Sequence, residues 1–489
     1  MSRSQGMTRR AALLGLSGAA AAAAIAAPWR ARAQGPGDRR YLVVVTGTGG
    51  ASIIDAMLAV RESESRSAST VNAYPDSMVQ NAPDSPLRFI DQRLDDIGPL
   101  PYAGEAVQST FVRKRASEMA VFTYTGTSVN HLIAEKRALT GNDAWQGRTV
   151  QEVCAATYGE GLLLPNVNMG VGGFIEPGLD PELPAYARAE PVTNATTWPF
   201  GLHGSKGIRR APSASLIDKA RRAREAIEAR SLFDRTFTRS DVLAEWQARR
   251  VDAERVEAQD LITRLNAQVS SPRLPLADYG LASSQDAALI ARTFPRATTD
   301  ALEAQAALAY LLIKNGISVS VTIGPSLSPA VGGEQVVDSP PLAFDFSHTA
   351  HRGGQAVMWS RMLSVAGRLI DLLEAAEHAG GGSFWDRTLM YFATDFGRTR
   401  SRPANARDFG SGHHLNNGAL LVSPRLRGNA VYGGIDPDTT LTYGFDPRTG
   451  RPEPGRHMTE RELFAGVVQT LGVSTAGSGL PDLSAIRRA

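Results

Sequence analysis

The chain has 489 residues, with 52 basic and 49 acidic side chains and a single cysteine, Cys154. One cysteine excludes an internal disulfide and a thiolate metal cluster. Five of the basic residues lie in the first 33 positions, so the remainder, with 47 basic and 49 acidic residues, is close to neutral and gives no indication of nucleic-acid binding.

The first 33 residues have the layout of an export signal. A basic start leads into a stretch of Ala, Leu and Gly, and Ala31-Arg32-Ala33 provides an A-x-A cleavage site. Arg9 and Arg10 stand just before the apolar stretch, as in substrates of the twin-arginine export machinery. The alternative is a membrane anchor, but the stretch is short and weakly apolar for a span. We expect a periplasmic or secreted mature protein, residues 34–489, with no stable membrane span after cleavage.

Five apolar runs predict buried β-strands, at 41–46, 119–124, 317–323, 388–394 and 418–423. They are nearly continuously apolar, which is typical of strands covered on both faces. Helix-like stretches lie between them, including 302–316, ended by Gly316, and 356–382, ended by a glycine run. This alternation predicts an α/β fold with a mainly parallel sheet flanked by helices.

Residues 212 to 271 interrupt the alternation. They are charged and alanine-rich, and they predict two or three amphipathic helices with their charges on a solvated face. We expect a helical insertion packed beside the sheet. A coiled-coil surface for a partner is the alternative.

Polar residues collect where the predicted strands end. In chain order they are Asp55; Thr127, Ser128 and His131; Asp345, His348 and His351; and Asp395, Arg398, His413 and His414. In open α/β sheets, ligands bind beyond the carboxyl ends of the strands. Each group has a plainer interpretation, because the acids suit helix caps or turns and the histidines suit solvated loops. Together they supply carboxylate and imidazole ligands, which suit zinc or manganese and, less readily, calcium.

Thr127 and Ser128 stand just before a predicted helix that begins near His131 and stops at Gly141. Unpaired amide groups at a helix start stabilise an anion, whether a phosphate or an alkoxide. The alternative is ordinary capping of the helix.

Several motifs resemble one bacterial family. They are FDFSHTAHRGGQ (344–355), TDFGRT (394–399), GSGHHLNNGALLV (410–422) and GNAVYGG (428–434). SVNHLIAEKRALTG (128–141), DAWQGR (143–148) and the closing HMTERELFAGVVQTLGV (457–473) are also similar. The family is usually exported by the twin-arginine route, is of unknown function, and looks like a branch of the alkaline phosphatase and sulfatase superfamily. The similarity covers most of residues 40 to 475, outside the 212–271 helices.

The resemblance implies an alkaline phosphatase or sulfatase-like fold and specific site residues. It implicates Asp345, His348, Asp395 and His413 as metal ligands and matches His131 to the family's helix histidine. Two positions depart from the family pattern. Ser52 stands where relatives carry an acid, with Asp55 three residues later, and His348 is offset by one from the family spacing, so that His351 could replace it.

The leading hypothesis is an exported, metal-dependent hydrolase of a small or polymeric phosphate or sulfate ester. Thr127 or Ser128 would be the nucleophile and Arg398 would neutralise the substrate's charge. Asp55, His351 and His414 are further candidate ligands. The alternative is a catalytically degenerate binding or assembly protein of the cell envelope on the same fold.

Overall fold

A computed structural model describes residues 38–93, 105–202, 212–244, 247, 259–325 and 343–488. The predicted export signal, residues 1–33, lies outside the described residues. Within these ranges, no helix is both long enough and apolar enough to cross a membrane.

Eight strands form the central sheet, in the order β10-β9-β11-β1-β12-β15-β8-β16. Their bounds are β1 Tyr41–Gly47, β8 Met119–Thr125, β9 Asn166–Asn168, β10 Glu190–Pro191, β11 Ser320–Ile323, β12 Thr388–Thr394, β15 Asn416–Val422 and β16 Ala430–Tyr432. Among these strands, β15 alone runs against the others. The predicted mainly parallel sheet is confirmed, and all five predicted strands are present.

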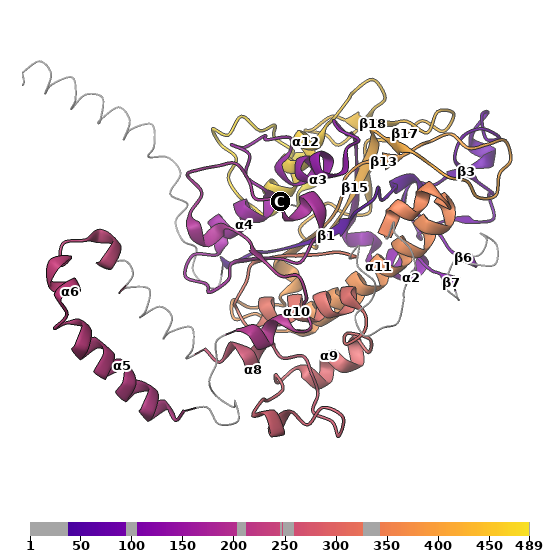
Figure 1. Ribbon diagram of the computed structural model, residues 1–489. Helices are drawn as coiled ribbons and strands as arrows, with labels where there is room; N and C mark the ends of the chain where they lie inside the picture. The colour runs from indigo at the N-terminus through magenta and orange to yellow at the C-terminus, as the bar shows by residue number, and fades with distance from the viewer. Residues whose placement is uncertain are drawn as a thin grey trace, which may run out of the picture.

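Helices cover both faces of the sheet, which explains why its central strands are apolar throughout. On one face lie α3 His131–Thr140, α4 Val150–Tyr158 and α12 Glu460–Thr470; on the other lie α2 Ser109–Arg115, α10 Ala301–Lys314 and α11 His351–Ala375 (Figure 1). Every residue of β1 and β12 is buried between these layers. Cys154 is buried in α4, and burial raises the pKa of its thiol.

Helix α11 ends earlier than its sequence pattern predicts. The chain becomes extended at Ala376 (φ −92°, ψ 119°), and Glu377 bridges to Ser383. Gly381 and Gly382 have positive φ values of 84° and 71°. The glycine run therefore forms a turn of its own after the helix instead of the helix end.

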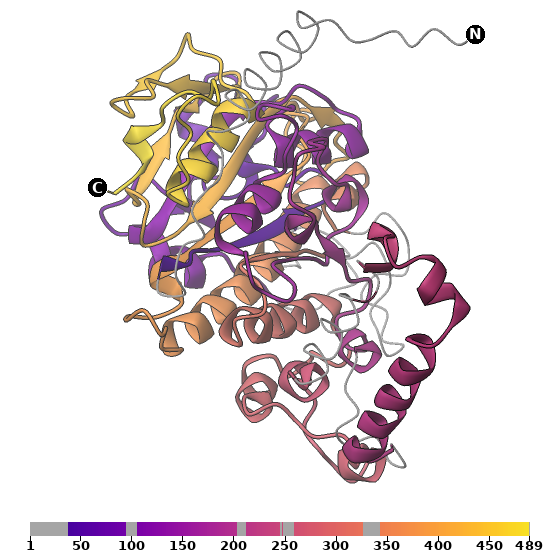
Figure 2. The same ribbon diagram turned by 90° about the vertical axis from the view of Figure 1, so that its left-hand side faces the viewer.

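The predicted helical insertion has two parts. Helices α5 Ala214–Glu228 and α6 Leu232–Thr236 lie apart from the sheet and its covering layers in both views (Figures 1 and 2). The short α8 Leu261–Leu265 packs instead against α10, and α9 Ala287–Thr293 follows it. Helix α8 thus packs on α10, one of the helices that cover the sheet, whereas α5 and α6 lie apart from these layers.

Smaller strands pair outside the central sheet. They are β2 Val60–Arg61 with β3 Ala73–Tyr74, β4 Val79–Asn81 with β5 Arg88–Ile90, β6 Gln92–Arg93 with β7 Glu105–Ala106, β13 Gly397–Arg398 with β14 His413–His414, and a three-stranded sheet of β17 Gly434–Ile435, β18 Thr442–Phe445 and β19 Pro452–Glu453.

The strand register gathers four chain segments at one edge of the central sheet. Gly47 at the end of β1 pairs with Thr394 at the end of β12. Thr125 at the end of β8 lies opposite Asn416 at the start of the antiparallel β15. The residues that follow β1, β8 and β12 therefore meet those that precede β15.

Candidate metal centre

Four side chains converge at this edge of the sheet. His131 begins α3, Asp345 and His348 lie in the 3-10 helix η10 (Ala343–His348), and His413 lies in β14. Asp345 Oδ1 is 3.3 Å from His348 Nε2, 3.6 Å from His131 Nε2 and 4.0 Å from His413 Nε2. The Nε2 atoms of His348 and His413 are 2.9 Å apart. Residues far apart in the sequence thus direct one carboxylate and three imidazoles at a common point.

The pairing of β13 with β14 decides which of the two adjacent histidines joins the cluster. Arg398 lies opposite His413, and Gly397 lies opposite His414. Successive side chains in a strand point to opposite faces. His414 therefore turns away from the cluster, and its Nδ1 accepts a hydrogen bond of 3.0 Å from the Asn416 amide. Burial lowers the pKa of His414.

The hydrogen bonds of His413 fix which ring nitrogen faces the cluster. Its Nδ1 lies 2.9 Å from the Val129 carbonyl, which can only accept, so Nδ1 carries the proton. In the neutral ring, Nε2 then presents its lone pair to the other candidate ligands. Burial and the charge of Arg398 lower the pKa of His413, which favours this neutral form. The ring stacks on Phe396 with 4.1 Å between centroids.

Asp395 holds His131 in the orientation that the cluster requires. His131 Nδ1 donates to Asp395 Oδ2 at 2.8 Å, and this hydrogen bond raises the pKa of His131. The buried carboxylate also accepts from the amides of Gly49 (3.2 Å), Gly50 (2.7 Å) and Phe396 (3.1 Å). Its lone pairs are therefore occupied by protein donors. Asp395 was expected among the ligands; the structure places it next to His131 and outside the group around Asp345, in a second group of possible ligand atoms with His131 and Glu135.

The turn after β1 requires glycine. Gly49 and Gly50 have φ values of 91° and 82°, which L side chains rarely adopt. A Cβ on Gly49 would lie 2.3 Å from the Asp345 amide nitrogen, and a Cβ on Gly50 would lie 2.7 Å from Arg398 Nε. The sequence Gly49-Gly50 thus lets the backbone approach Asp395, Asp345 and Arg398 at once.

Arg398 contacts two of the clustered side chains, Asp345 and His348, from the interior of the protein. Its side chain is fully buried, and burial lowers its pKa. Its N–H groups contact the carbonyls of Gly49, Phe344 and Ser411, Asp345 Oδ1 and His348 Nε2. We expected this guanidinium to bind a substrate anion. The structure corrects that expectation, because its donors are used inside the protein to fix Asp345 and the neighbouring loops.

Asp55 and His351 form a separate buried pair. The 3-10 helix and α11 are interrupted at Ala350, whose backbone is extended (φ −138°, ψ 92°). His348 and His351 consequently do not share a face as their three-residue spacing predicts. His351 Nε2 lies 3.0 Å from Asp55 Oδ2, and Nδ1 lies 2.8 Å from Ser411 Oγ.

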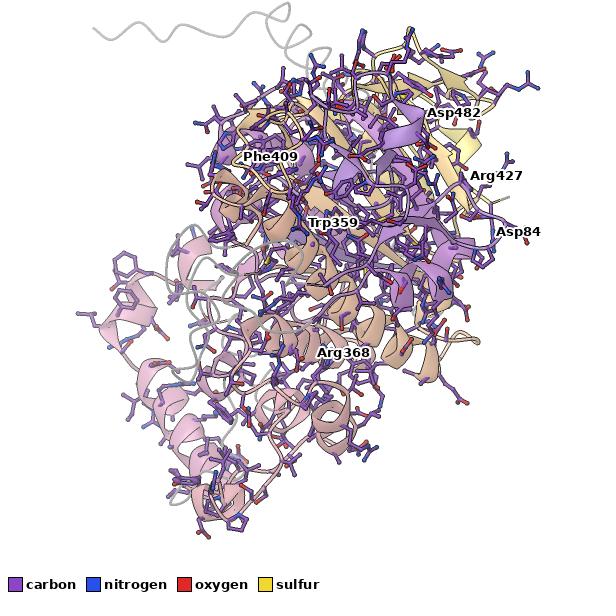
Figure 3. The ribbon with its side chains drawn as sticks, turned by 90° about the vertical axis from the view of Figure 1, so that its right-hand side faces the viewer. Asp84, Trp359, Arg368, Phe409, Arg427 and Asp482 are labelled. Carbon is purple, nitrogen blue, oxygen red and sulfur yellow. The ribbon has the colours of Figure 1, made fainter. Side chains whose placement is uncertain are left out.

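The charge state of Asp55 follows from this pairing. Burial alone would raise the pKa of Asp55, but the charge and the hydrogen bond of His351 lower it to about 2. Tyr74 and Asn72 donate to the same carboxylate. Phe409, labelled in Figure 3 with Trp359 of α11, packs its ring on His351 at 5.0 Å. Asp55 and His351 therefore lie outside the converging group.

The two candidate nucleophiles have different surroundings. Thr127 Oγ1 donates to Glu460 Oε1 at 3.0 Å and accepts from Arg137 at 3.1 Å. Ser128 Oγ only accepts, from the Asn130 amide at 3.1 Å. Asn130 caps α3 through the Ile133 amide, so neither hydroxyl is the cap of the helix.

Glu135 was not identified from the sequence. It lies one helical turn after His131, and the two can offer metal ligand atoms together with Asp395. Burial, followed by the charge of Asp395, raises the pKa of Glu135 to about 8. It also accepts a hydrogen bond from the Gly173 amide. The H-x-x-x-E spacing in HLIAE, which places both side chains on one helix face, was the available signal.

The donor set fits a divalent cation. Two ligand atoms on one tetrahedral zinc stand about 3.3 Å apart. The neighbouring candidate atoms here are 2.9 to 4.0 Å apart. The Nε2 atoms of His348 and His413 approach within hydrogen-bond distance, so a proton or a cation must separate their lone pairs. Calcium prefers six to eight oxygen ligands, which this cluster of imidazoles does not supply.

Comparison with known proteins does not assign a family. No family model and no curated protein matches the chain. Solved structures that match include Ps i-CgsB in complex with k-i-k-neocarrahexaose (8% identity, 91% of this chain and 74% of that chain, TM-score 0.31). A second is the lipoteichoic acid synthase LtaP from Listeria monocytogenes (10% identity, 92% of this chain and 76% of that chain, TM-score 0.31). A third is the phosphonate monoester hydrolase SpPMH from Silicibacter pomeroyi (12% identity, 89% of this chain and 74% of that chain, TM-score 0.31). Likeness this low identifies no activity.

Proposed function

We propose that this chain is a metal-dependent hydrolase of a phosphate or sulfate ester. The observation that carries the proposal is the convergence of His131, Asp345, His348 and His413 at the edge of the sheet where ligands of α/β proteins bind. Between about a quarter and two fifths of each side chain is exposed, so a substrate can reach the cluster. Export by the twin-arginine route to the periplasm or beyond belongs to the same proposal and rests on the N-terminal pattern.

The four side chains would hold zinc or manganese, with zinc favoured by the three imidazoles. When bound, such a cation acts as a Lewis acid that polarises an ester oxygen and balances the charge of the anionic group. Asp395 and Val129 keep His131 and His413 in the tautomers that leave Nε2 available. Arg398 holds the Asp345 carboxylate in place.

Thr127 is the better of the two nucleophile candidates. A nucleophilic hydroxyl needs a base within hydrogen-bond reach. The Glu460 carboxylate accepts the Thr127 hydroxyl proton at 3.0 Å, whereas Ser128 Oγ has no such acceptor among the residues that the structure describes. In the proposed reaction Thr127 Oγ1 attacks the phosphorus or sulfur, its proton passes to Glu460, and the ester bond to the alcohol breaks, with the leaving oxygen taking up a proton. Water then cleaves the bond between Thr127 Oγ1 and the phosphorus or sulfur, which releases phosphate or sulfate and restores the hydroxyl. The His413–Val129 hydrogen bond keeps the loop that carries Thr127 beside the cluster.

The test compares two adjacent histidines. We would measure metal per chain by elemental mass spectrometry on protein purified without chelators, for the wild type, His413→Ala and His414→Ala. We expect bound metal in the wild type and in His414→Ala and its loss in His413→Ala. The metal-loaded proteins would then be assayed with 4-nitrophenyl phosphate and 4-nitrophenyl sulfate. A wild type that binds no zinc or manganese refutes the proposal.

A binding or assembly protein is the second candidate, and one observation favours it. Ser52 stands where relatives carry an acid, and it serves the fold: its amide donates to Gln355 and its carbonyl accepts from Trp359. If the wild type binds metal and hydrolyses neither ester, and if Thr127→Ala binds metal equally well, the binding protein becomes the better account.

A further inference from the structure

Helices α5 and α6, with the residues just after them, expose several large apolar side chains. Leu216, Ile227, Leu232, Phe233, Phe237 and Val242 are each between 48% and 76% exposed. Single exposed apolar residues are ordinary, but grouped ones mark an interaction surface. All six lie within 27 consecutive residues. Four of them belong to α5 and α6, which stand apart from the body of the protein (Figure 2), and Phe237 and Val242 follow α6.

The side chains of α5 are sorted around its axis. At about 100° per residue, Leu216, Ala220, Ala223 and Ile227 share one face. Lys219 and Arg224 project about 70° to either side of that face. Asp218 and Glu225 project from the opposite side. Arg221 and Arg222 flank these two acids, and Arg221 lies 3.7 Å from Asp218. The helix therefore has an apolar stripe, basic margins and a back of mixed charge.

Helix α6 extends the apolar surface with larger groups. It presents Leu232 and Phe233, and the rings of Phe233 and Phe237 lie 4.9 Å apart. Across residues 212–244 there are seven basic and five acidic side chains, so this segment is positively charged within a nearly neutral chain.

This arrangement matches an anionic lipid surface. Apolar side chains of an interfacial helix enter the boundary between headgroups and acyl chains. Lysine and arginine at the margins extend along the apolar face and place their charges at the level of the phosphates. The back of the helix, where acidic and basic side chains alternate, remains in water. A second copy of the same helix fits less well, because its basic margins would meet those of the first and repel them.

We propose that α5 and α6 form a docking surface for membranes that contain anionic phospholipids. The surface lies away from the cluster of His131, Asp345, His348 and His413, and the proposal does not depend on hydrolase activity. It gives these helices a function, namely to hold the protein at a membrane surface.

The test is vesicle co-sedimentation of the whole mature chain. One set of vesicles contains phosphatidylcholine with 30% phosphatidylglycerol and the other phosphatidylcholine alone, in low and in high salt. We expect binding at least about tenfold tighter to the anionic vesicles and weakened by salt. Leu232→Asp with Phe233→Asp, and separately Lys219→Glu with Arg224→Glu, should each reduce binding about tenfold or more.

Leu441→Asp is the matched control, because Leu441 is also exposed (39%) but lies in the loop before β18. It should bind like the wild type, and circular dichroism should show all variants folded. Equal binding to both vesicle types, or none to either, overturns the proposal. The proposal is also overturned if light scattering shows that the wild type forms a dimer, if the Leu232 and Phe233 substitutions abolish that dimer, and if no vesicles are bound. Metal content does not enter the measurement, so failure here is distinct from failure of the hydrolase proposal.

Discussion

The substitution Asp395→Asn tests how the candidate metal centre is built. Asp395 accepts from three backbone amides and from His131 Nδ1. An asparagine has the same shape but carries an NH₂ group in place of one carboxylate oxygen, and that group must face some of these donors. If that group faces His131, the ring must change tautomer to accept it, and Nε2 then carries a proton and loses the lone pair that faces Asp345.

The expected effect on metal binding follows from this change of tautomer. Loss of the outer hydrogen-bond partner of a ligating histidine lowers metal affinity about 10–100-fold. This corresponds to about 1.4–2.8 kcal/mol of binding free energy. The apo-protein should also lose about 1–3 kcal/mol of stability, because a buried donor is left facing another donor.

The assay is competition of the apo-protein with a chromophoric chelator for zinc, together with urea unfolding of the apo-protein. Asp300→Asn is the matched control, because Asp300 is also a buried carboxylate that accepts backbone amides, but at the start of α10. It should lose stability and keep its zinc affinity. Wild-type affinity in Asp395→Asn would refute the orienting role. A loss of zinc binding as complete as the loss expected for His413→Ala would show that Asp395 is itself a ligand.

Three further outcomes follow from the geometry. Since the hydrogen bond that His131 donates to Asp395 raises the pKa of His131, zinc affinity should fall with decreasing pH from above the ordinary histidine range, as measured by the same competition between about pH 6 and 8.5. The pKa of Asp55, about 2 against about 3.9 in the unfolded chain, should contribute about 2–3 kcal/mol of folding stability above pH 4. That contribution is lost as the pH falls through 2, and unfolding of Asp55→Asn should lack this dependence. Gly49→Ala should abolish metal binding through its clash with Asp345, whereas Gly161→Ala, with a similar positive φ and open space around its Cβ, should only lose about 1–3 kcal/mol of stability.

The long strands could be predicted because each is a nearly continuous apolar run, and the long helices because they fill the stretches between those runs. The sequence did not predict β9, β10 or β16, which are two or three residues long and too short to carry a pattern. Site residues were harder to assign than elements. The spacing of His348 and His351 suggested a shared face, and a single extended residue, Ala350, separates them. Nothing local in the sequence marks that interruption.

The direction of β15 decides whether the candidate site can exist. His413 precedes β15, and in a wholly parallel sheet it would lie at the edge where strands begin. With seven residues in β15, that edge is about 23 Å from the edge where Asp395 follows β12. Because β15 runs antiparallel between β12 and β8, its amino end meets their carboxyl ends. Strand direction depends on pairing between distant segments, so the apolar run at 418–423 could not reveal it. The one reversed strand brings His413 to His131, Asp345 and His348.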